Sequence, residues 1–385
     1  MKVAMISGTY PPLKCGVGDF VCNLSRALGA KGVEVHVLTS ASVSRKAYRD
    51  SERVTVWPVV RSWSVWGVLP LARCLFVLSP DAIHFQYPTL VYGRKVGINV
   101  LPLVLKILFP LIPQVLTLHE FEQYGFFGRL RLVFNILAAK SVCVTTEREK
   151  KAVNSLYPFA GRKVHVVPIG SNIPAEGRRS VGLRLLRKLG VKRNETSLVF
   201  FGWAGPGKGL PDLFRAVCLL NQGGVRVRLV CVSELGPGRD PFHAGLARLV
   251  RELKIGHIVT WTGFLPASRV SSILKACDVC VLPFEDGLKM NRGSFTAALV
   301  NGARIVTTYP SKGAVPPFVR KLPVVFSRPS AGCLAVVIRQ TLSGGSGPRF
   351  TERNRTQVSR MLSWESVAGI HLDILSRKDP IRSLK

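Results

Sequence analysis

The clearest fold signal in the chain is residues 2–40, KVAMISGTYPPLKCGVGDFVCNLSRALGAKGVEVHVLTS. A short apolar segment precedes a loop rich in glycine and proline. Residues 20–30 follow, where Phe20, Leu24 and Leu28 recur at helical spacing, and a second apolar segment comes next. A strand, a loop, a helix and a strand in this order form a βαβ unit. Such a unit predicts a parallel sheet with helices on its faces.

The same alternation continues along the chain in two series. The further strand-length segments of the first series are 53–60, 82–85, 114–119, 141–146 and 164–168. The second series predicts strands at 197–202, 226–232, 258–261, 278–282, 304–308 and 323–326, and helices at 210–221, 243–253, 267–276 and 293–301. We therefore predict an α/β protein of two doubly wound, Rossmann-like domains that face each other across a cleft.

The predicted organisation has four parts. They are an N-terminal domain (1–173), a basic linker (174–196), a C-terminal domain (197–360) and a C-terminal helix (361–385). The linker contains one short amphipathic helix, with Val181, Leu185 and Leu189 on one face. A length of 385 residues also suggests two domains, at about 150 residues each.

Composition restricts the class of protein. The apolar fraction of 47% is ample for two cores and excludes disorder over most of the chain. Lysine and arginine number 54 against 22 acidic residues, a net charge of +32, which points to nucleic acid, an anionic membrane or phosphorylated substrates. No helix-turn-helix, zinc-finger or RNA-recognition motif is present, so we expect no nucleic-acid partner.

Cysteine use and the first residues indicate the compartment. Nine cysteines are too few for a disulfide scaffold, and their odd number favours reduced, intracellular thiols. The apolar run after Lys2 is shorter than a signal peptide needs, which predicts a cytoplasmic protein. Residues 98–118 are apolar enough for a membrane span, but three prolines, Pro102, Pro110 and Pro113, argue against one.

The loop at residues 8–19 is the first candidate ligand site. Ligands of open α/β sheets bind at the carboxyl ends of strands, beside helix N-termini. Gly16 and Gly18 stand in this loop just before the predicted helix, where glycine lets the backbone approach an anion. The spacing lacks the third glycine of the dinucleotide fingerprint, because that position is Val21. An ordinary βα turn is the alternative interpretation.

A second loop, FFGWAGPGKGLPDLF at 200–214, resembles a phosphate site more closely. A strand ends at Gly202, and Gly207 and Lys208 lie just before a helix. Backbone N–H groups and one lysine suit a phosphate. The loop is not a Walker A motif, because Gly209 follows the lysine. The alternative is a solvated lysine.

The third candidate is LPFEDGLKMNRGS at 282–294. Glu285 and Asp286 suit the hydroxyl groups of a sugar or ribose, whereas Arg292 can bind phosphate with two parallel hydrogen bonds. Gly293 and Ser294 open the next helix and add amide and hydroxyl donors. Solvated charges are the alternative here too.

Two histidines occupy the ends of predicted strands in the first half. His119 ends VLTLH, and His84 and Gln86 lie in IHFQYP, where side chains face a cleft or serve a structural role. No two aspartates stand two residues apart, so a metal held by such a pair has no support, and we expect no metal site.

Several of these motifs, in this order, resemble the family-4 glycosyltransferases, which are retaining enzymes with the two-domain GT-B fold. The matching segments are TYPPLKCGVGDF, TLHEF, VVPIGSNIP, FFGWAGPGKG, WTGFLP at 261–266 and LSWESVAGIH at 362–371. The resemblance makes the first domain the acceptor side and the second the nucleotide-sugar side. It implies that the C-terminal helix crosses back to the first domain.

The resemblance implies transfer of a sugar from a nucleotide sugar to a glycan or lipid-linked acceptor, with retention of anomeric configuration and without a cofactor or metal. Lys208 stands at the place of the family's phosphate-binding lysine, and we infer that Arg292 adds a second cation while His119 lies by the donor sugar or the acceptor. The predicted donor-binding residues are Gly16, Gly18, Gly202, Gly207, Gly263, Phe264, Glu285, Asp286, Gly293 and Ser294.

Two departures from the family pattern bear on activity. Trp203 replaces an arginine five residues before the loop lysine, and Lys289 and Ala297 stand where the family has a pair of glutamates. The segment resembles instead a subgroup with the pattern PFxDGxxxxRGS. A nucleotide-sugar-binding homologue with impaired catalysis is therefore the alternative function.

The excess charge needs a partner besides the nucleotide sugar. Residues 140–193 hold 13 lysines and arginines against three acids, and residues 62–78 and 98–113 are apolar with isolated basic residues. Basic and apolar surface together predict peripheral binding to the cytoplasmic face of an anionic membrane through the first domain. The alternative is that both segments are buried helices.

Overall fold

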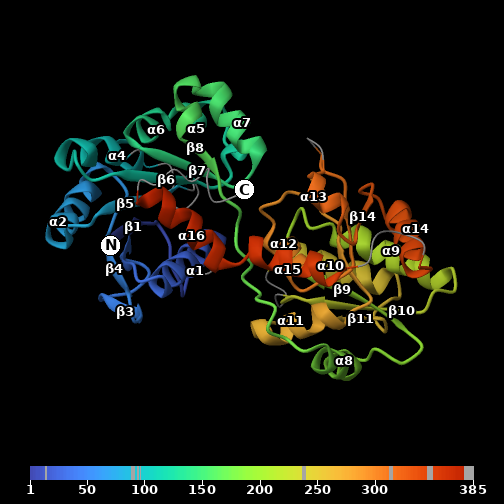
Figure 1. Ribbon diagram of the computed structural model, residues 1–385. Helices are drawn as coiled ribbons and strands as arrows, with labels where there is room; N and C mark the ends of the chain where they lie inside the picture. The colour runs from blue at the N-terminus through green and yellow to red at the C-terminus, as the bar shows by residue number, and fades with distance from the viewer. Residues whose placement is uncertain are drawn as a thin grey trace. The chain divides into compact units, whose positions relative to one another are not determined.

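The computed structural model describes residues 1–13, 15–87, 92, 95, 97–235, 240–311, 315–344 and 350–376. The chain divides into two compact units (Figure 1). The first is Met1–Gly170 with Ser363–Lys385, and the second is Ser171–Leu362. Each has a parallel sheet with helices, which confirms the predicted α/β class.

The sheet of the first unit has the strand order β3-β4-β2-β1-β5-β6-β7-β8. Its strands are β1 Lys2–Ile6, β2 Glu34–Ser40, β3 Tyr48–Ser51, β4 Val54–Val60, β5 Ala82–Tyr87, β6 Gln114–Leu118, β7 Ser141–Val144 and β8 Val164–Val166. All pairs are parallel except β3 with β4, a short edge strand that the sequence did not predict. The central strands are apolar on both faces because helices cover both.

Two layers of helices cover this sheet. The elements are α1 Gly16–Ala30, η1 Val65–Gly67, α2 Val68–Leu78, α4 Gly97–Leu108, η2 Phe121–Gln123, α5 Phe126–Leu130, α6 Val133–Ala138, α7 Glu147–Leu156, η3 Pro158–Lys163 and α16 Trp364–Leu375. One face buries side chains of α2, α4, α6 and α7. The other buries those of α1 and α16, which lie side by side in Figure 1.

Helix α1 begins earlier than its apolar spacing indicated. Its first residue is Gly16, so Gly16 and Gly18 lie in the first helical turn rather than in the loop before it. The apolar repeat starts only at Phe20, because the first turn rests on the chain leaving β1. A Cβ atom at Gly18 would lie 3.3 Å from Thr9 Oγ1. Glycine there allows close packing of the helix on that loop.

The second unit has a six-stranded parallel sheet of order β11-β10-β9-β12-β13-β14. Its strands are β9 Thr196–Phe201, β10 Val227–Val232, β11 Val259–Trp261, β12 Val279–Leu282, β13 Ile305–Thr308 and β14 Val324–Ser327. Its helices are α8 Arg179–Lys188, α9 Leu210–Gln222, α10 Pro241–Glu252, α11 Ala267–Ala276, α12 Gly293–Val300, α13 Pro317–Arg320, α14 Ala331–Leu342 and α15 Glu352–Met361. Every predicted strand and helix of this half is present within about three residues of its predicted limits.

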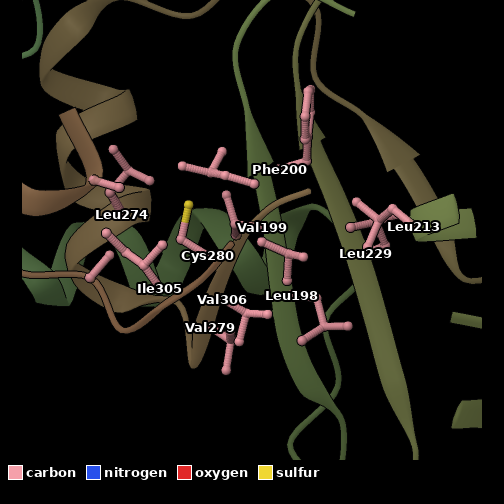
Figure 2. Packing of buried hydrophobic residues seen from close by; sticks show 14 of the residues in the cluster. Leu198, Val199, Phe200, Leu213, Leu229, Leu274, Val279, Cys280, Ile305 and Val306 are labelled. Atoms are coloured by element: carbon pink, nitrogen blue, oxygen red, sulfur yellow. The ribbon is translucent and has the colours of Figure 1, made fainter. Parts of the chain in front are cut away.

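Figure 2 shows the core of this unit, where β9, β12 and β13 meet the helices. Leu198, Val199 and Phe200 belong to β9, which pairs with β10 on one side and with β12 on the other. Cys280 lies among these aliphatic side chains, and burial raises its pKa. A thiol in this setting packs as a small apolar group.

Residues 174–196, predicted as a linker, are part of the second unit. Helix α8 packs against α11, and its buried positions are Gly182 and Leu186. The predicted face of Val181, Leu185 and Leu189 is only partly buried. The buried face of α8 differs from the predicted one because glycine at 182 lets the backbone approach α11. The residues of α8 that contact α11 are therefore small as well as apolar.

None of the helices in the described residues is both long and apolar enough to cross a membrane. Helix α4, which contains the apolar residues after 97, has 12 residues and ends at Leu108, just before Pro110.

Candidate active site

The site in the second unit lies where the strand order changes direction. Strands β9 and β12 pair directly, through Leu198 with Val279 and Val199 with Cys280, although β10 and β11 come between them in sequence. The carboxyl ends of strands at such a point are where open α/β sheets bind their ligands. The loops that follow β9 and β12 carry the motifs that the sequence singled out.

Close backbone contact joins the two loops. The N–H of Glu285 donates to the carbonyl of Gly207 at 3.1 Å. Gly209 has a φ of +68°, and a Cβ atom there would lie 1.8 Å from the carbonyl oxygen of Pro283. Only glycine meets both conditions, because other residues avoid positive φ and would collide with the second loop. This glycine places Lys208 against the β12 loop.

Five side chains from these loops form what we call the Phe284 cluster: Lys208, Phe284, Asp286, Lys289 and Arg292. The ring of Phe284 is fully buried. Two of the three cationic side chains, those of Lys208 and Arg292, lie over this ring. Lys208 Nζ is 5.5 Å from the ring centroid and Arg292 Cζ is 4.6 Å from it. Cation–π attraction thus helps to hold each of these two positive charges against the same ring.

Asp286 organises the cations of this cluster. One of its carboxylate oxygens binds Arg292, and the other lies 2.7 Å from Lys289 Nζ. Both oxygens of Asp286 are thus engaged by cations, whereas the carboxylate of Glu285 is exposed. Arg292 Nε is buried and has no hydrogen-bond partner among the described residues. A buried donor of this kind costs about 1–3 kcal/mol until a ligand or water pairs with it.

Neighbouring strands and helices fix both loops. Thr308 Oγ1 donates to the carbonyl of Phe284 at 2.6 Å, and the Leu288 N–H donates to the carbonyl of Thr308 at 3.2 Å. On the other loop, His243 Nε2 donates to the carbonyl of Ala204 at 2.8 Å. The cations therefore stand on a braced backbone rather than on free loops.

Gly16 and Gly18, also predicted to bind the donor, lie in the first turn of α1 in the first unit. The remaining predicted donor residues of the second unit lie at two places on this edge. Arg292 is the N-cap of α12, and Gly293 and Ser294 form its first turn, where a Cβ atom at Gly202 would approach Ser294 at 3.3 Å. Gly263 and Phe264 follow β11, which is separated from β9 by β10. The Phe264 ring is 87% exposed, so its apolar face is open to a ligand.

A second polar site lies in the first unit and contains His119. We call it the histidine cluster: His84 and Gln86 of β5, Thr117 of β6, His119 just after β6, and His371 of α16. His119 Nε2 donates to Gln86 Oε1 at 2.9 Å, and Gln86 Nε2 donates to His84 Nε2 at 3.1 Å. Thr117 Oγ1 lies 2.7 Å from the same His84 nitrogen. With Nε2 as donor, Nδ1 of His119 is its acceptor nitrogen.

Burial keeps this cluster neutral. It lowers the pKa of His119 to about 4 and that of His371 to about 3, and it holds the pKa of His84 well below its usual range. The His84 and His371 ring centroids are 5.1 Å apart, and Phe20 of α1 meets the His119 ring edge-on at 4.8 Å. The resemblance placed the helix that carries His371 on the first domain, but nothing in its local sequence shows that His371 meets His84 of β5.

The described residues contain no group of three or more histidine, cysteine, aspartate or glutamate side chains arranged to hold a metal ion.

Comparison with known proteins agrees with the geometry. Residues 15–173 match the family Glycosyltransferase Family 4. The 2-deoxystreptamine N-acetyl-D-glucosaminyltransferase of Streptomyces fradiae is 26% identical over 296 residues, 68% of each chain. The alpha-monoglucosyldiacylglycerol synthase of Acholeplasma laidlawii is 23% identical over 308 residues, 72% of this chain and 73% of the relative.

Solved structures give the fold. Anabaena HepE in complex with UDP and glucose superposes with a TM-score of 0.69 at 15% identity, over 98% of this chain and 99% of that one. The chain is a glycosyltransferase with the GT-B fold, as the sequence predicted. Within that class, the match to Glycosyltransferase Family 4 covers residues 15–173.

Proposed function

We propose that this chain transfers a sugar from a nucleotide sugar to a glycan or lipid-linked acceptor, with retention of anomeric configuration and without a metal ion. The observation that carries the proposal is the placement of Lys208 and Arg292 over the ring of Phe284, in two loops that follow strands of the second sheet. A nucleotide diphosphate needs cations at such a place, and the orphaned Arg292 Nε gives it a further donor.

The chemistry follows from where charge develops. As the glycosidic bond breaks, the diphosphate leaving group gains negative charge. Preorganised cations stabilise that charge more in the transition state than in the bound substrate. Asp286 holds Arg292 in place, so little reorganisation is required when the bond breaks. Glu285 is positioned for a hydroxyl of the sugar or ribose, and Phe264 for the nucleobase.

His119 serves as a neutral acceptor in this proposal. With its Nε2 hydrogen bonded to Gln86, its Nδ1 accepts a hydrogen bond from a hydroxyl of the donor sugar or the acceptor. Its lowered pKa keeps the ring uncharged at neutral pH. A cation is therefore not added beside the developing oxocarbenium ion, where it would oppose positive charge.

A thermal-shift panel of UDP-, GDP- and ADP-sugars tests the donor site. HepE binds UDP and glucose, which makes UDP-glucose the first donor to examine. We expect stabilisation by one nucleotide series, absent in Arg292→Ala. The product from a labelled donor, read by its anomeric NMR coupling, tests retention. Binding without either transfer or donor hydrolysis would favour the alternative of a catalytically impaired homologue. Trp203 and Ala297, which depart from the family pattern, are the reason to consider this alternative. An inverted product would overturn the retaining mechanism.

A further inference from the structure

The first unit exposes large apolar side chains on one helical layer. Fourteen of the 21 exposed large apolar residues in the described chain lie between Val65 and Phe159. They are Val65, Trp66, Leu69, Phe76, Val77, Ile107, Leu108, Leu111, Phe126, Phe127, Leu130, Phe134, Leu137 and Phe159. We call them the apolar face. Exposed apolar clusters of this kind mark interaction surfaces, because contact between apolar side chains and water is unfavourable in free energy.

These residues belong to elements that form a single layer on the sheet. Helix α4 packs against α2 and α6, and Figure 1 shows α2, α4, α5 and α6 as neighbours. Each helix buries its own apolar stripe against the sheet, as Leu71 and Leu75 do in α2. The exposed residues are a second apolar surface on the same helices. Trp66 is 86% exposed and Leu111 is 85% exposed, so the unit's own fold leaves them in water.

A basic pocket adjoins this face along α2. It has a volume of about 590 Å³, and its lining includes Arg45, Arg61 and Arg73 but no carboxylate. Among the described residues, no acidic side chain pairs with any of the three guanidinium groups. Leu69 also lines the pocket. We call it the three-arginine pocket.

The spacing of α2 joins the pocket to the apolar face. Leu69, Arg73 and Phe76 stand at i, i+4 and i+7, so they lie on one side of the helix. Leu69 and Arg73 line the pocket, and Phe76 is 76% exposed. An anion bound by the arginines would therefore have apolar side chains beside it. That combination matches a lipid, whose phosphate is joined to acyl chains.

We propose that the three-arginine pocket and the apolar face together bind an anionic phospholipid surface. Charge complementarity favours lipid over a protein partner: the chain carries +32, and residues 53–119 contain Asp81 as their single acid. A tryptophan and several phenylalanines flanked by arginine are typical of a surface that lies in the membrane interface. The inference goes beyond the proposed sugar transfer and stands without it, because it rests on the first unit alone.

Vesicle flotation of the full chain tests the proposal. The probes are vesicles of phosphatidylcholine alone and vesicles with phosphatidylglycerol added, at low salt. Anionic vesicles should bind the chain and neutral vesicles should not. Arg61→Ala with Arg73→Ala should weaken binding about fivefold per arginine, since a basic residue at an anionic leaflet contributes about 1 kcal/mol. The pair Trp66→Ser and Phe76→Ser, both on the surface, should weaken it as well.

Matched controls separate the lipid from other partners. Arg187→Ala with Lys188→Ala removes the same charge from exposed positions of α8 and should leave binding unchanged. Inorganic phosphate at millimolar concentration should not release the chain from vesicles. Its success as a competitor would overturn the lipid in favour of a free phosphate ligand. Equal binding to neutral vesicles, or no binding to either, also overturns the proposal.

A second copy of this chain is the remaining candidate partner for the apolar face. If light scattering finds a dimer that Trp66→Ser dissociates, the apolar face is an interface between two copies and the lipid proposal fails. Lys208→Ala should float like the unaltered chain. If nucleotide sugars raise the melting temperature but the chain does not bind vesicles, the lipid proposal is wrong and the proposed function still stands.

Discussion

Arg292 and Lys208 carry the leaving-group charge in the proposed reaction, so their loss should fall on the chemical step. We expect Lys208→Ala and Arg292→Ala each to lower kcat/KM by about 30- to 900-fold, or about 2–4 kcal/mol of transition-state stabilisation. Steady-state kinetics with the donor found in the melting panel provides the measurement. Values near wild type for both variants would remove the phosphate assignment.

Two further variants show whether geometry or charge is responsible. Arg292→Lys keeps the charge but loses the planar group that lies over Phe284, and we expect partial activity. Arg187→Ala removes an exposed charge far along the same unit and should have no effect. If Arg292→Lys were as active as the unaltered chain, point charge alone would suffice at this position.

Sequence alone pointed to Lys208, Asp286 and Arg292 of the Phe284 cluster, but not to Lys289 or to Phe284, whose ring lies beneath two of the cations. Lys208 and Arg292 stand in recognisable loops after predicted strands, which is why they could be proposed as partners. Phe284 looks like one more apolar residue after a strand. Its role depends on the close contact between Gly209 and the carbonyl oxygen of Pro283. These two residues belong to different loops, so the contact cannot be seen in the sequence.

Helix α16 reaches the histidine cluster through His371, and this contact predicts a pH dependence. The folded state binds no proton on His119 or His371 until pH is near their lowered pKa values of about 4 and 3, whereas unfolded histidine titrates near 6.5. Stability from these groups is therefore complete above about pH 6.5 and falls as pH decreases toward 4. The loss is about 1.4 kcal/mol per pH unit for each histidine that only the unfolded chain protonates.

Urea unfolding between pH 7 and 5 measures this effect. His371→Phe fills similar space and should flatten the pH dependence, although it can lower stability at pH 7. His257→Gln changes an exposed histidine of the second unit and serves as the control. Equal slopes for the unaltered chain and His371→Phe would contradict the assignment of His371 to a buried, neutral state.

The contact of α8 with α11 depends on a single glycine. A Cβ atom at Gly182 would lie 1.9 Å from the carbonyl oxygen of Ser272. Gly182→Ala should therefore destabilise the second unit by about 1–3 kcal/mol, the usual cost of overpacking. Gly245→Ala, on α10 with open space around it, should be neutral or stabilising by about 0.5–1 kcal/mol. Thermal unfolding of the two variants gives the comparison, and equal melting temperatures would exclude a tight α8–α11 contact.

Helices and strands were predictable where apolar residues follow a single periodicity. They were less predictable where packing contacts set the first and last residues of a helix. Strand β9 and helix α9 follow from continuous apolar runs and helical spacing. The start of α1 was missed because its first turn is polar and small. Helix α8 was predicted, but it was assigned to a linker rather than to the second unit. Part of its contact with α11 is made by the backbone at Gly182, which leaves no apolar signal at that position.

The whole chain has few carboxylates for a divalent cation: 22 acidic residues stand against 54 basic ones, and no two aspartates are two residues apart. In the proposed reaction, Lys208 and Arg292 neutralise the diphosphate in place of a metal. We therefore expect sugar transfer to retain activity within about twofold after dialysis against EDTA, since two fixed cations supply the charge. EDTA presaturated with calcium is the control, because a chelator that merely blocks the phosphate site inhibits in both forms. Complete loss with free EDTA, restored by Mg²⁺ or Mn²⁺, would mean that a metal carried with the nucleotide sugar takes the leaving-group charge.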